Sequence, residues 1–359
     1  MPTSPELLTE FNQRHQVMLE RNKSHEVKAF EKYLVKMAKV VRGKLEGEDL
    51  TEFSRARLEK LIAEIDKSLN TIFTDYKVEW RGQVVDLAKY EADFEIKSLN
   101  QVVDYNFAVP SASQLDQAVF GNPLSAKGYE GYLLDPFFDN ELTKKSIDRI
   151  SGAIRAGQFQ GLTTPQIIQG LIGTKKANYT DGIVALSYRD ASTITRTALQ
   201  HSAMQARQKT WAQNSDIIKG WVFRATLDNR TSRQCASLDS TVWPIGKGPM
   251  PPRHPACRSS MTAELDDRFQ FLREDATRST RGQDGVQSVS ANTTYYEWLK
   301  TQSANFQDAA IGATRGKLLR DGGLSAERFA EIGIGKTFEP LTLTQMRELD
   351  PVAFERAGL

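Results

Sequence analysis

The sequence predicts an α+β protein that is predominantly α-helical, and three observations support this prediction. Apolar residues recur at spacings of three and four through long stretches of the chain, which is the pattern of amphipathic helices. Between residues 220 and 260 the pattern changes to short apolar runs joined by turn residues. Capping residues, glycines and prolines separate the stretches. We therefore expect a long N-terminal helical arm, a central module of helices and small β-structure, and a C-terminal helical extension.

The N-terminal arm is predicted to span residues 1–110. Ser4-Pro5 followed by an acidic residue is a typical helix start, and an apolar stripe over 27–41 continues this helix until two glycines interrupt it. A second stripe covers 58–76, and a third helix is expected over about 84–103. We expect these stripes to pack against one another in a hairpin or bundle. Long helices of this kind also serve for docking onto a larger assembly.

Residues 111–138 are rich in glycine, proline and aromatic residues, and we expect a loop-rich connector there. The central module is predicted to span residues 139–265. Within it we expect two main helices and two strands, over residues 140–156, 183–213, 221–227 and 241–244.

Residues 266–294 are polar and charged with little periodicity, so we expect a flexible loop, above all over 277–292. The C-terminal helical extension is predicted to span 295–359. A basic run in this extension is close enough to form a patch for DNA phosphates, although such a run is also typical of a solvated helix face. The run consists of Arg315, Lys317 and Arg320.

Composition narrows the class of protein. The chain has 359 residues, of which 26% are charged and 40% apolar, as in an ordinary soluble protein of two or three domains. The net charge of +2 gives no global reason to expect nucleic-acid or membrane binding, and two cysteines argue against a disulfide-built secreted protein. No apolar run has the length of a membrane span, and the N-terminus lacks a signal-peptide pattern. We expect a cytosolic protein, or one carried inside a particle that is assembled in the cytosol.

Both cysteines and one of the four histidines fall in the β-rich stretch. His254 and Cys257 are three residues apart in a stiff proline-rich segment, and Cys235 can face them from a nearby turn. Three interpretations stay open: a metal site with these three ligands, a disulfide between the cysteines, or two buried thiols. A structural zinc ion takes four ligands, so Asp239, Asp228 or water would have to complete such a site.

Charged residues of the same stretch are expected to act inside the fold. Asp228 follows a predicted strand and is placed to accept backbone N–H bonds in the turn. Arg230 is expected to pair with a carboxylate through a bidentate fork. Arg196 lies in the middle of the 183–213 helix, where a salt bridge or a carbonyl clamp is the expected role. His201, on the same helix, is expected to be a packed or surface histidine rather than a ligand.

These residues also form a spaced signature. It reads Asp228-x-Arg230-Thr231-x-x-x-Cys235-x-x-Leu238-Asp239, followed by Pro251-Pro-x-His254-Pro-x-Cys257-Arg258, with Thr195-Arg196-Thr197 on the helix upstream. This pattern resembles the Mu F-like minor head proteins, the head morphogenesis family of tailed bacteriophages. The resemblance covers about residues 140–262, and a second stretch from Trp298 to Leu324 resembles the C-terminal extensions of such proteins.

The chain departs from the family pattern at three positions. Ala198 stands where the family has an acidic residue, Ser240 stands where it often has glycine, and Ser259 stands where it often has a further cysteine. The resemblance implies that Arg196, Asp228, Arg230, Asp239 and Arg258 belong to a structural motif. The missing cysteine weakens the case for zinc that the family pattern would make.

The resemblance implies a structural and assembly role in the virion. The protein would lie in the phage head near the portal after assembly in the host cytoplasm. It would bind the portal protein or the major capsid protein, with genomic DNA as a further contact, and would aid head assembly, DNA packaging or DNA ejection. No membrane contact is expected, and no cofactor other than the zinc that the cysteines could hold.

An enzyme is not expected, because the chain has no glycine-rich phosphate loop, no nucleophile elbow and no zinc-protease helix. The alternative function is a metal-dependent hydrolase or nuclease, built on Asp228, Asp239, His254 and the two cysteines. A DNA-binding module acting alone is disfavoured by the near-neutral net charge and by the lack of a known reading motif.

Overall fold

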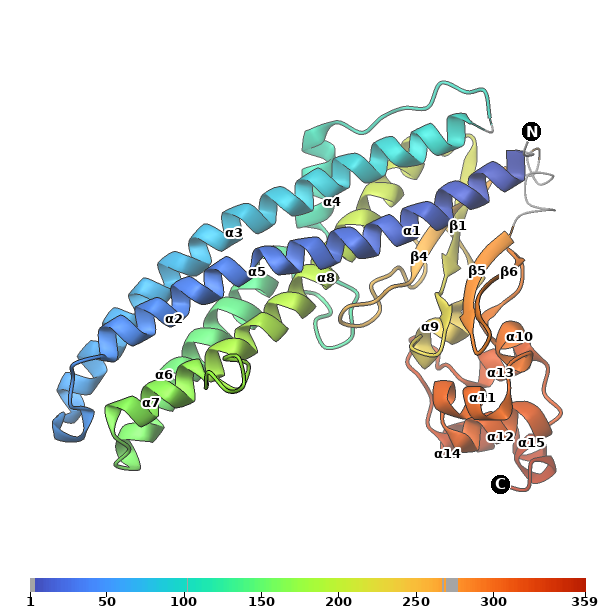
Figure 1. Ribbon diagram of the computed structural model, residues 1–359. Helices are drawn as coiled ribbons and strands as arrows, with labels where there is room; N and C mark the ends of the chain where they lie inside the picture. Colours follow the sequence, from blue (N-terminus) through green and yellow to red (C-terminus); the bar gives the residue numbers. More distant parts are fainter. Residues whose placement is uncertain (1–3, 102, 267, 269–276) are drawn as a thin grey trace.

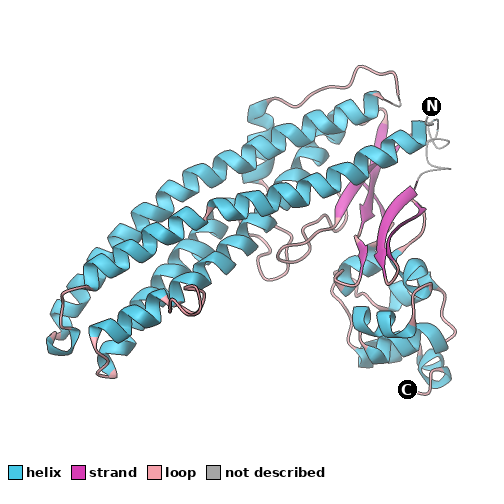
Figure 2. Cartoon of the chain, viewed as in Figure 1, coloured by secondary structure: helices cyan, strands magenta, loops and turns pink. Residues whose placement is uncertain are grey.

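The structure is a computed structural model that describes residues 4–101, 103–266, 268 and 277–359. Helices account for 61% of the chain, and two small three-stranded sheets lie in its middle, so the predicted fold class is confirmed. Figure 1 shows a long helical arm, a region of strands at one end of it, and a group of short helices beyond the strands that ends at the C-terminus. Figure 2 shows the same separation of helices and strands.

Two long helical segments run side by side through the arm. α1 (Ser4–Ala29) and α2 (Glu31–Leu45) follow one another almost end to end, and α3 (Arg55–Asn100) returns along them after the short η1 turn (Leu50–Glu52). α3 is a single helix of 46 residues, about 70 Å long. The prediction of two helices here was wrong, because the buried stripe continues from Tyr76 through Trp80 without a break.

The predicted connector is partly helical. α4 (Ala112–Gly121) begins at Ser111 with a capping box to Gln114, and α5 (Leu134–Phe138) follows the loop over 122–133. The prediction of loop was therefore wrong for the two helices. The remaining helices before the centre of the fold are η2 (Asp139–Lys144), α6 (Lys145–Phe159) and α7 (Thr164–Ile172).

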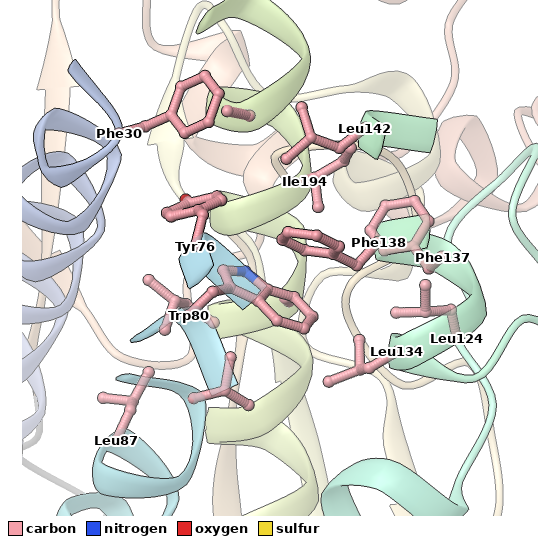
Figure 3. Close-up of a cluster of buried hydrophobic side chains, with 14 of the residues drawn as sticks. Phe30, Tyr76, Trp80, Leu87, Leu124, Leu134, Phe137, Phe138, Leu142 and Ile194 are labelled. Carbon is pink, nitrogen blue, oxygen red and sulfur yellow. The ribbon is translucent and has the colours of Figure 1, made fainter. Parts of the chain in front are cut away.

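α8 (Ile183–Gln213) is the central helix of the molecule, and its position agrees with the prediction. It contacts all three long helices of the arm as well as α4, α6 and α7. Figure 3 shows part of this core, where Tyr76 and Trp80 of α3 meet Phe138 and Ile194. One continuous apolar cluster extends from the arm to the first sheet, so the arm and the central module form one folded unit rather than two.

Two sheets complete the centre of the fold. The first is antiparallel with strand order β3-β1-β4, and the second pairs β2 in parallel with β5, which forms a hairpin with β6. A short helix, α9 (Arg233–Leu238), lies between β2 and β3. The strands are β1 (Ile218–Arg224), β2 (Leu227–Asp228), β3 (Val242–Pro244), β4 (Ser260–Leu265), β5 (Thr277–Gly282) and β6 (Gly285–Ser290).

The β5–β6 hairpin replaces the flexible loop that was predicted over 277–292, so that prediction was wrong. β6 is exposed except at Val289, which is partly buried, and it therefore shows no regular alternation of apolar and polar residues. The turn lies between Gly282 and Gly285, and Gly285 has a φ of +91°, a conformation that favours glycine. Residues 267 and 269–276 of the predicted loop lie outside the described residues.

The C-terminal extension is helical, as predicted, and has a core of its own. This second apolar cluster includes Trp298, Leu318 and Phe354, and it also takes in Leu227 and Ala236 from the central module. The helices are α10 (Tyr295–Lys300), α11 (Ala304–Ile311), α12 (Ala313–Asp321), α13 (Ala326–Ile332), α14 (Leu343–Leu349) and α15 (Pro351–Arg356). Across the part of the chain that the structure describes, no helix is long and apolar enough to cross a membrane.

Candidate functional site

The two cysteines and His254 converge at one point of the central module. Cys235 lies on α9, whose first turn is capped by Ser232, and Cys257 lies just before β4. The two Sγ atoms are 3.7 Å apart, in contact but not bonded, and the sulfurs and a ring nitrogen of His254 all lie within 4.8 Å of one another. The structure therefore brings together the three side chains that the sequence proposed as metal ligands. Both cysteines are buried, and His254 is half-buried.

Contacts among Cys235, His254 and Cys257 shift the pKa values of all three side chains. Burial raises the pKa of the Cys257 thiol, but hydrogen bonds with Cys235 and His254 outweigh burial and bring the pKa well below its ordinary value. Burial lowers the pKa of His254, and its contact with Cys257 more than offsets this, so the net shift is upward. The hydrogen bond to Cys257, followed by burial, raises the pKa of Cys235 well above its ordinary value. The shifts therefore favour the thiolate form at Cys257 and the thiol form at Cys235.

A buried lysine links the arm to this cluster. Lys23 of α1 is fully buried and contacts Glu20 at 2.6 Å and the side-chain oxygen of Gln200. Gln200 in turn donates to the backbone oxygen of Ser259 at 2.6 Å, and the nearby Ser259 side chain lowers the pKa of Cys235 slightly against the larger upward effects. Burial lowers the pKa of Lys23 despite the opposing effect of Glu20. Ser259, at the position where the resembled pattern often has a further cysteine, therefore lies near Cys235.

Asp228 is held by Arg258 rather than by Arg230. The Arg258 guanidinium makes two parallel bonds to the Asp228 carboxylate, at 2.7 and 2.8 Å, whereas Arg230 is exposed and 3.6 Å away. The expected backbone bond is present, from the Arg230 N–H to Asp228 at 3.0 Å. Burial raises the pKa of Asp228, but the bonds from Arg258 lower it more, so the carboxylate stays ionised. The expectation that Arg230 would form the bidentate fork was wrong.

Asp239 is the second buried carboxylate of the motif. Arg278 of β5 binds it through two bonds of 2.8 and 3.0 Å, and the Ala225 N–H donates to it at 2.8 Å. Both oxygens are therefore engaged in ties between the two sheets. The structure does not bring Asp239 or Asp228 into the Cys–His cluster, so the suggestion that Asp239 completes a metal site is not supported by its position.

Two residues of α8 have the internal roles that were expected. Arg196 donates to Ser24 at 2.9 Å and lies 3.6 Å from Glu20, so it ties α8 to α1. His201 is buried and contacts the Val119 backbone oxygen at 3.1 Å. Burial lowers its pKa to about 4, so His201 is neutral in the folded protein at neutral pH.

The side chains of the predicted basic patch in the C-terminal extension bind neighbouring groups of the same extension. Arg315 donates to the Leu341 backbone oxygen at 3.0 Å, and Lys317 pairs with Asp321 at 3.0 Å. Arg320 pairs with Asp308 at 2.8 Å. These contacts match the solvated-face interpretation and leave little unpaired charge for DNA.

A larger basic surface lies elsewhere, in a groove of about 1200 Å³ between α1 and the two sheets. Its described lining carries more arginine and lysine side chains than carboxylates. The basic residues are Arg21, Lys28, Arg224, Arg230, Arg258, Arg278 and Arg281, and the acidic ones are Glu20, Glu95 and Asp228. The groove is therefore positive, although the whole chain is nearly neutral.

Basic side chains without an ion-pair partner in the described part of the chain lie at the rim of this groove. Arg21, His25 and Lys28 recur at helical spacing on one exposed face of α1, and Arg281 is exposed on β5. Among the described residues, Arg21, Lys28 and Arg281 have no ion-pair partner. The sequence analysis missed this surface, although the repeat of basic residues on α1 was a usable signal.

A buried ionic network was also missed. Arg207 of α8 contacts Glu91 at 3.0 Å and Glu95 at 3.8 Å, both on α3. His15 of α1 contacts the other oxygen of Glu91 at 2.7 Å, and Trp211 donates to Glu95 at 3.0 Å. The available signal was that both glutamates fall on the apolar stripe of α3, where an acidic side chain needs a partner.

Comparison of the chain with protein-family models, curated proteins and solved structures finds no match. The family resemblance therefore rests on the spaced signature alone.

Proposed function

We propose that this protein is a minor head protein of a tailed bacteriophage, which binds the portal protein or the inner surface of the capsid. The observation that carries the proposal is that residues of the spaced signature hold the elements of the fold together. Asp228, Asp239, Arg196 and Arg258 form buried or half-buried ties between helices and sheets. Such residues specify a rigid module rather than a reaction, which suits a protein that acts through assembly.

The helical arm is the proposed docking element. The ends of α2, α3, α6 and α7 meet at the free end of the arm, where Arg155 pairs with Glu59 at 2.8 Å and Leu50 donates to Thr164 at 3.1 Å. Phe159, the last residue of α6, is 90% exposed at this end. An exposed aromatic side chain on a rigid support is typical of the residues that anchor protein interfaces.

The proposal is tested by co-expressing the chain with the portal and major capsid proteins of its own phage. Particles are purified by sedimentation, and bound chains are counted by quantitative mass spectrometry. We expect a fixed, low number of copies per particle, retained by the portal protein alone. Phe159→Ser is expected to weaken portal binding about tenfold, because losing a central aromatic anchor costs on the order of 1–2 kcal/mol.

The matched control is Val286→Ser, which removes an apolar side chain that is 73% exposed on β6, away from the free end of the arm. It should leave portal binding unchanged. A chain that stays at the top of the gradient with both head proteins present would contradict the proposed function. Equal binding by the two variants and the parent chain would instead contradict the arm tip as the docking surface.

The alternative enzyme receives no support from the positions of the aspartates. A hydrolase or nuclease built on these aspartates needs their carboxylates to face a metal ion. Asp228 and Asp239 instead direct their oxygens to Arg258 and Arg278. The proposal therefore assigns them to structure.

Genomic DNA is the proposed second contact, at the groove rather than at the C-terminal extension. When lysine and arginine side chains neutralise DNA phosphates, the binding affinity falls as the salt concentration rises. The slope of log affinity against log salt concentration is about −0.9 for each neutralised phosphate. Replacing Arg21 and Lys28 together by glutamine should therefore weaken binding to duplex DNA and reduce that slope by about two. Fluorescence anisotropy over a salt series measures both quantities.

The comparison variant carries Lys317→Gln and Arg320→Gln, which remove the same charge from the patch that the sequence suggested. We expect its DNA affinity and salt slope to equal those of the parent chain. The reverse result, with the groove variant unaffected, would place the DNA contact on the C-terminal extension and overturn the groove.

A further inference from the structure

We propose that Cys235, His254 and Cys257 bind one zinc ion, which fastens α9 to the proline-rich segment before β4. This inference does not depend on the proposed role in the phage head. It rests on the convergence of three side chains from two separate segments, whose ligand atoms lie within 4.8 Å of one another. Two thiolates and an imidazole are ligands that zinc prefers in structural sites.

The spacing of the sulfur atoms fits a tetrahedral ion. With zinc–sulfur bonds of about 2.3 Å, two thiolates of a tetrahedron are separated by about 3.8 Å. The Cys235 and Cys257 sulfurs are 3.7 Å apart. A disulfide requires about 2.05 Å between the same atoms, so the two cysteines are placed for a shared ligand rather than for a bond to each other.

The imidazole of His254 makes a backbone hydrogen bond that metal-binding histidines commonly make. Its Nδ1 lies 3.0 Å from the Pro255 backbone oxygen, and a carbonyl oxygen only accepts, so Nδ1 carries the proton. The lone pair is then on Nε2. A ligating imidazole commonly donates its other N–H to a backbone carbonyl in this way, which fixes the tautomer.

The segment that carries the ligands is held before any ion arrives. The Ala256 N–H donates to Thr197 of α8 at 2.9 Å, and the Cys257 N–H donates to the His254 backbone oxygen at 3.2 Å. On the other side, Ser232 accepts from the Cys235 N–H at 3.2 Å. Binding would therefore cost little ordering entropy, because both segments are already fixed to the core.

The fourth position is assigned to water. Among the described histidine, cysteine, aspartate and glutamate residues, no fourth side chain joins the group. Ser259 is buried two residues after Cys257, and its side chain is near enough to Cys235 to affect the pKa of that thiol, so it borders the site. A cysteine at this position would place a third sulfur next to the other two. Ser259→Cys should therefore complete a four-ligand site and tighten the binding of zinc.

The test measures metal content and ligand type in the full chain, purified without chelators from zinc-supplemented medium. We expect stoichiometric zinc, and X-ray absorption with two sulfur neighbours at about 2.3 Å and one nitrogen at about 2.0 Å. Exchange with Co²⁺ should give the visible absorption of tetrahedral cobalt and a near-ultraviolet thiolate band. His254→Asn should lose most of the metal, whereas His25→Asn, which changes an exposed histidine outside the cluster, should keep it.

Stability gives a second measurement that does not depend on metal analysis. A ligand that binds only the folded state raises the melting temperature, so removal of zinc by a chelator should lower it in the parent chain. Ser259→Cys should retain zinc at chelator concentrations that strip the parent chain. Substoichiometric metal with no cobalt spectrum, in a folded chain whose two thiols react freely or are joined in a disulfide, would overturn the proposal.

Discussion

Replacing Arg207 with methionine is expected to destabilise the protein by about 3–5 kcal/mol, the cost of leaving a buried charge without its partner. Arg207 and Glu91 are both fully buried, and the guanidinium reaches Glu91 at 3.0 Å. The same guanidinium donates to the Met261 backbone oxygen at 2.6 Å, which ties α8 to β4. Methionine fills much of the same volume, so the loss reports on the charge rather than on a cavity.

Burial raises the pKa of Glu91, but the charges of Arg207 and His15 outweigh burial and hold the pKa below its ordinary value. Once Arg207 is removed, the carboxylate must stay ionised without its strongest partner or take up a proton. Urea unfolding followed by circular dichroism at neutral pH measures the change, with the midpoint falling at an unchanged slope.

Two further variants separate this mechanism from a general effect of substitution in α8. Arg189→Met changes an exposed arginine on the same helix and should cost little. Adding Glu91→Gln to Arg207→Met removes the stranded charge and should recover part of the lost stability. A double variant that is no more stable than Arg207→Met would show that the charge of Glu91 is not the source of the loss.

Replacing Asp239 with asparagine should cost about 3 kcal/mol and release the β5–β6 hairpin from the first sheet. Asp239 has no exposed side-chain surface, and Arg278 is 12% exposed, so their two bonds lie in a poorly hydrated environment. The amide keeps the shape of the carboxylate but loses the charge and one acceptor for Arg278. Arg278 then stays buried without a counter-charge.

Hydrogen exchange followed by mass spectrometry measures the release directly. We expect faster exchange over 277–290 in Asp239→Asn, together with a lower unfolding midpoint. Asp284→Asn changes an exposed aspartate in the hairpin turn and serves as the control. Unchanged exchange in both variants would mean that strand pairing alone holds the hairpin, and that the Asp239–Arg278 pair contributes little.

The β5–β6 hairpin is also the clearest limit of prediction from this sequence. Sequence periodicity reports which face of a strand is buried, and β6 has only one partly buried side chain, that of Val289. The hairpin is defined instead by the Arg278–Asp239 pair and by the parallel pairing of β2 with β5. Neither contact leaves a local signal, because its partners are far apart along the chain.

The candidate metal group shows the opposite case. His254 and Cys257 lie close together because they are three residues apart in a stiff proline-rich segment. Both the spacing and the prolines can be read from the sequence. α9 places Cys235 beside these two residues. The turn residues before Cys235 were enough to suggest that it faces His254 and Cys257. What failed was the choice of a fourth ligand, because Asp239 is nearby in sequence but is used by Arg278.

The sequence by itself determined the helical class, the bounds of α8 and the short spacing of His254 and Cys257, because these depend on residues a few positions apart. Only the tertiary structure decided which charges pair. Asp228 binds Arg258, 30 positions away, and Arg207 binds Glu91, 116 positions away. An ionised side chain that folding removes from water needs an opposite charge in space, and the packing of α3, α8 and the sheets determines which one is within reach.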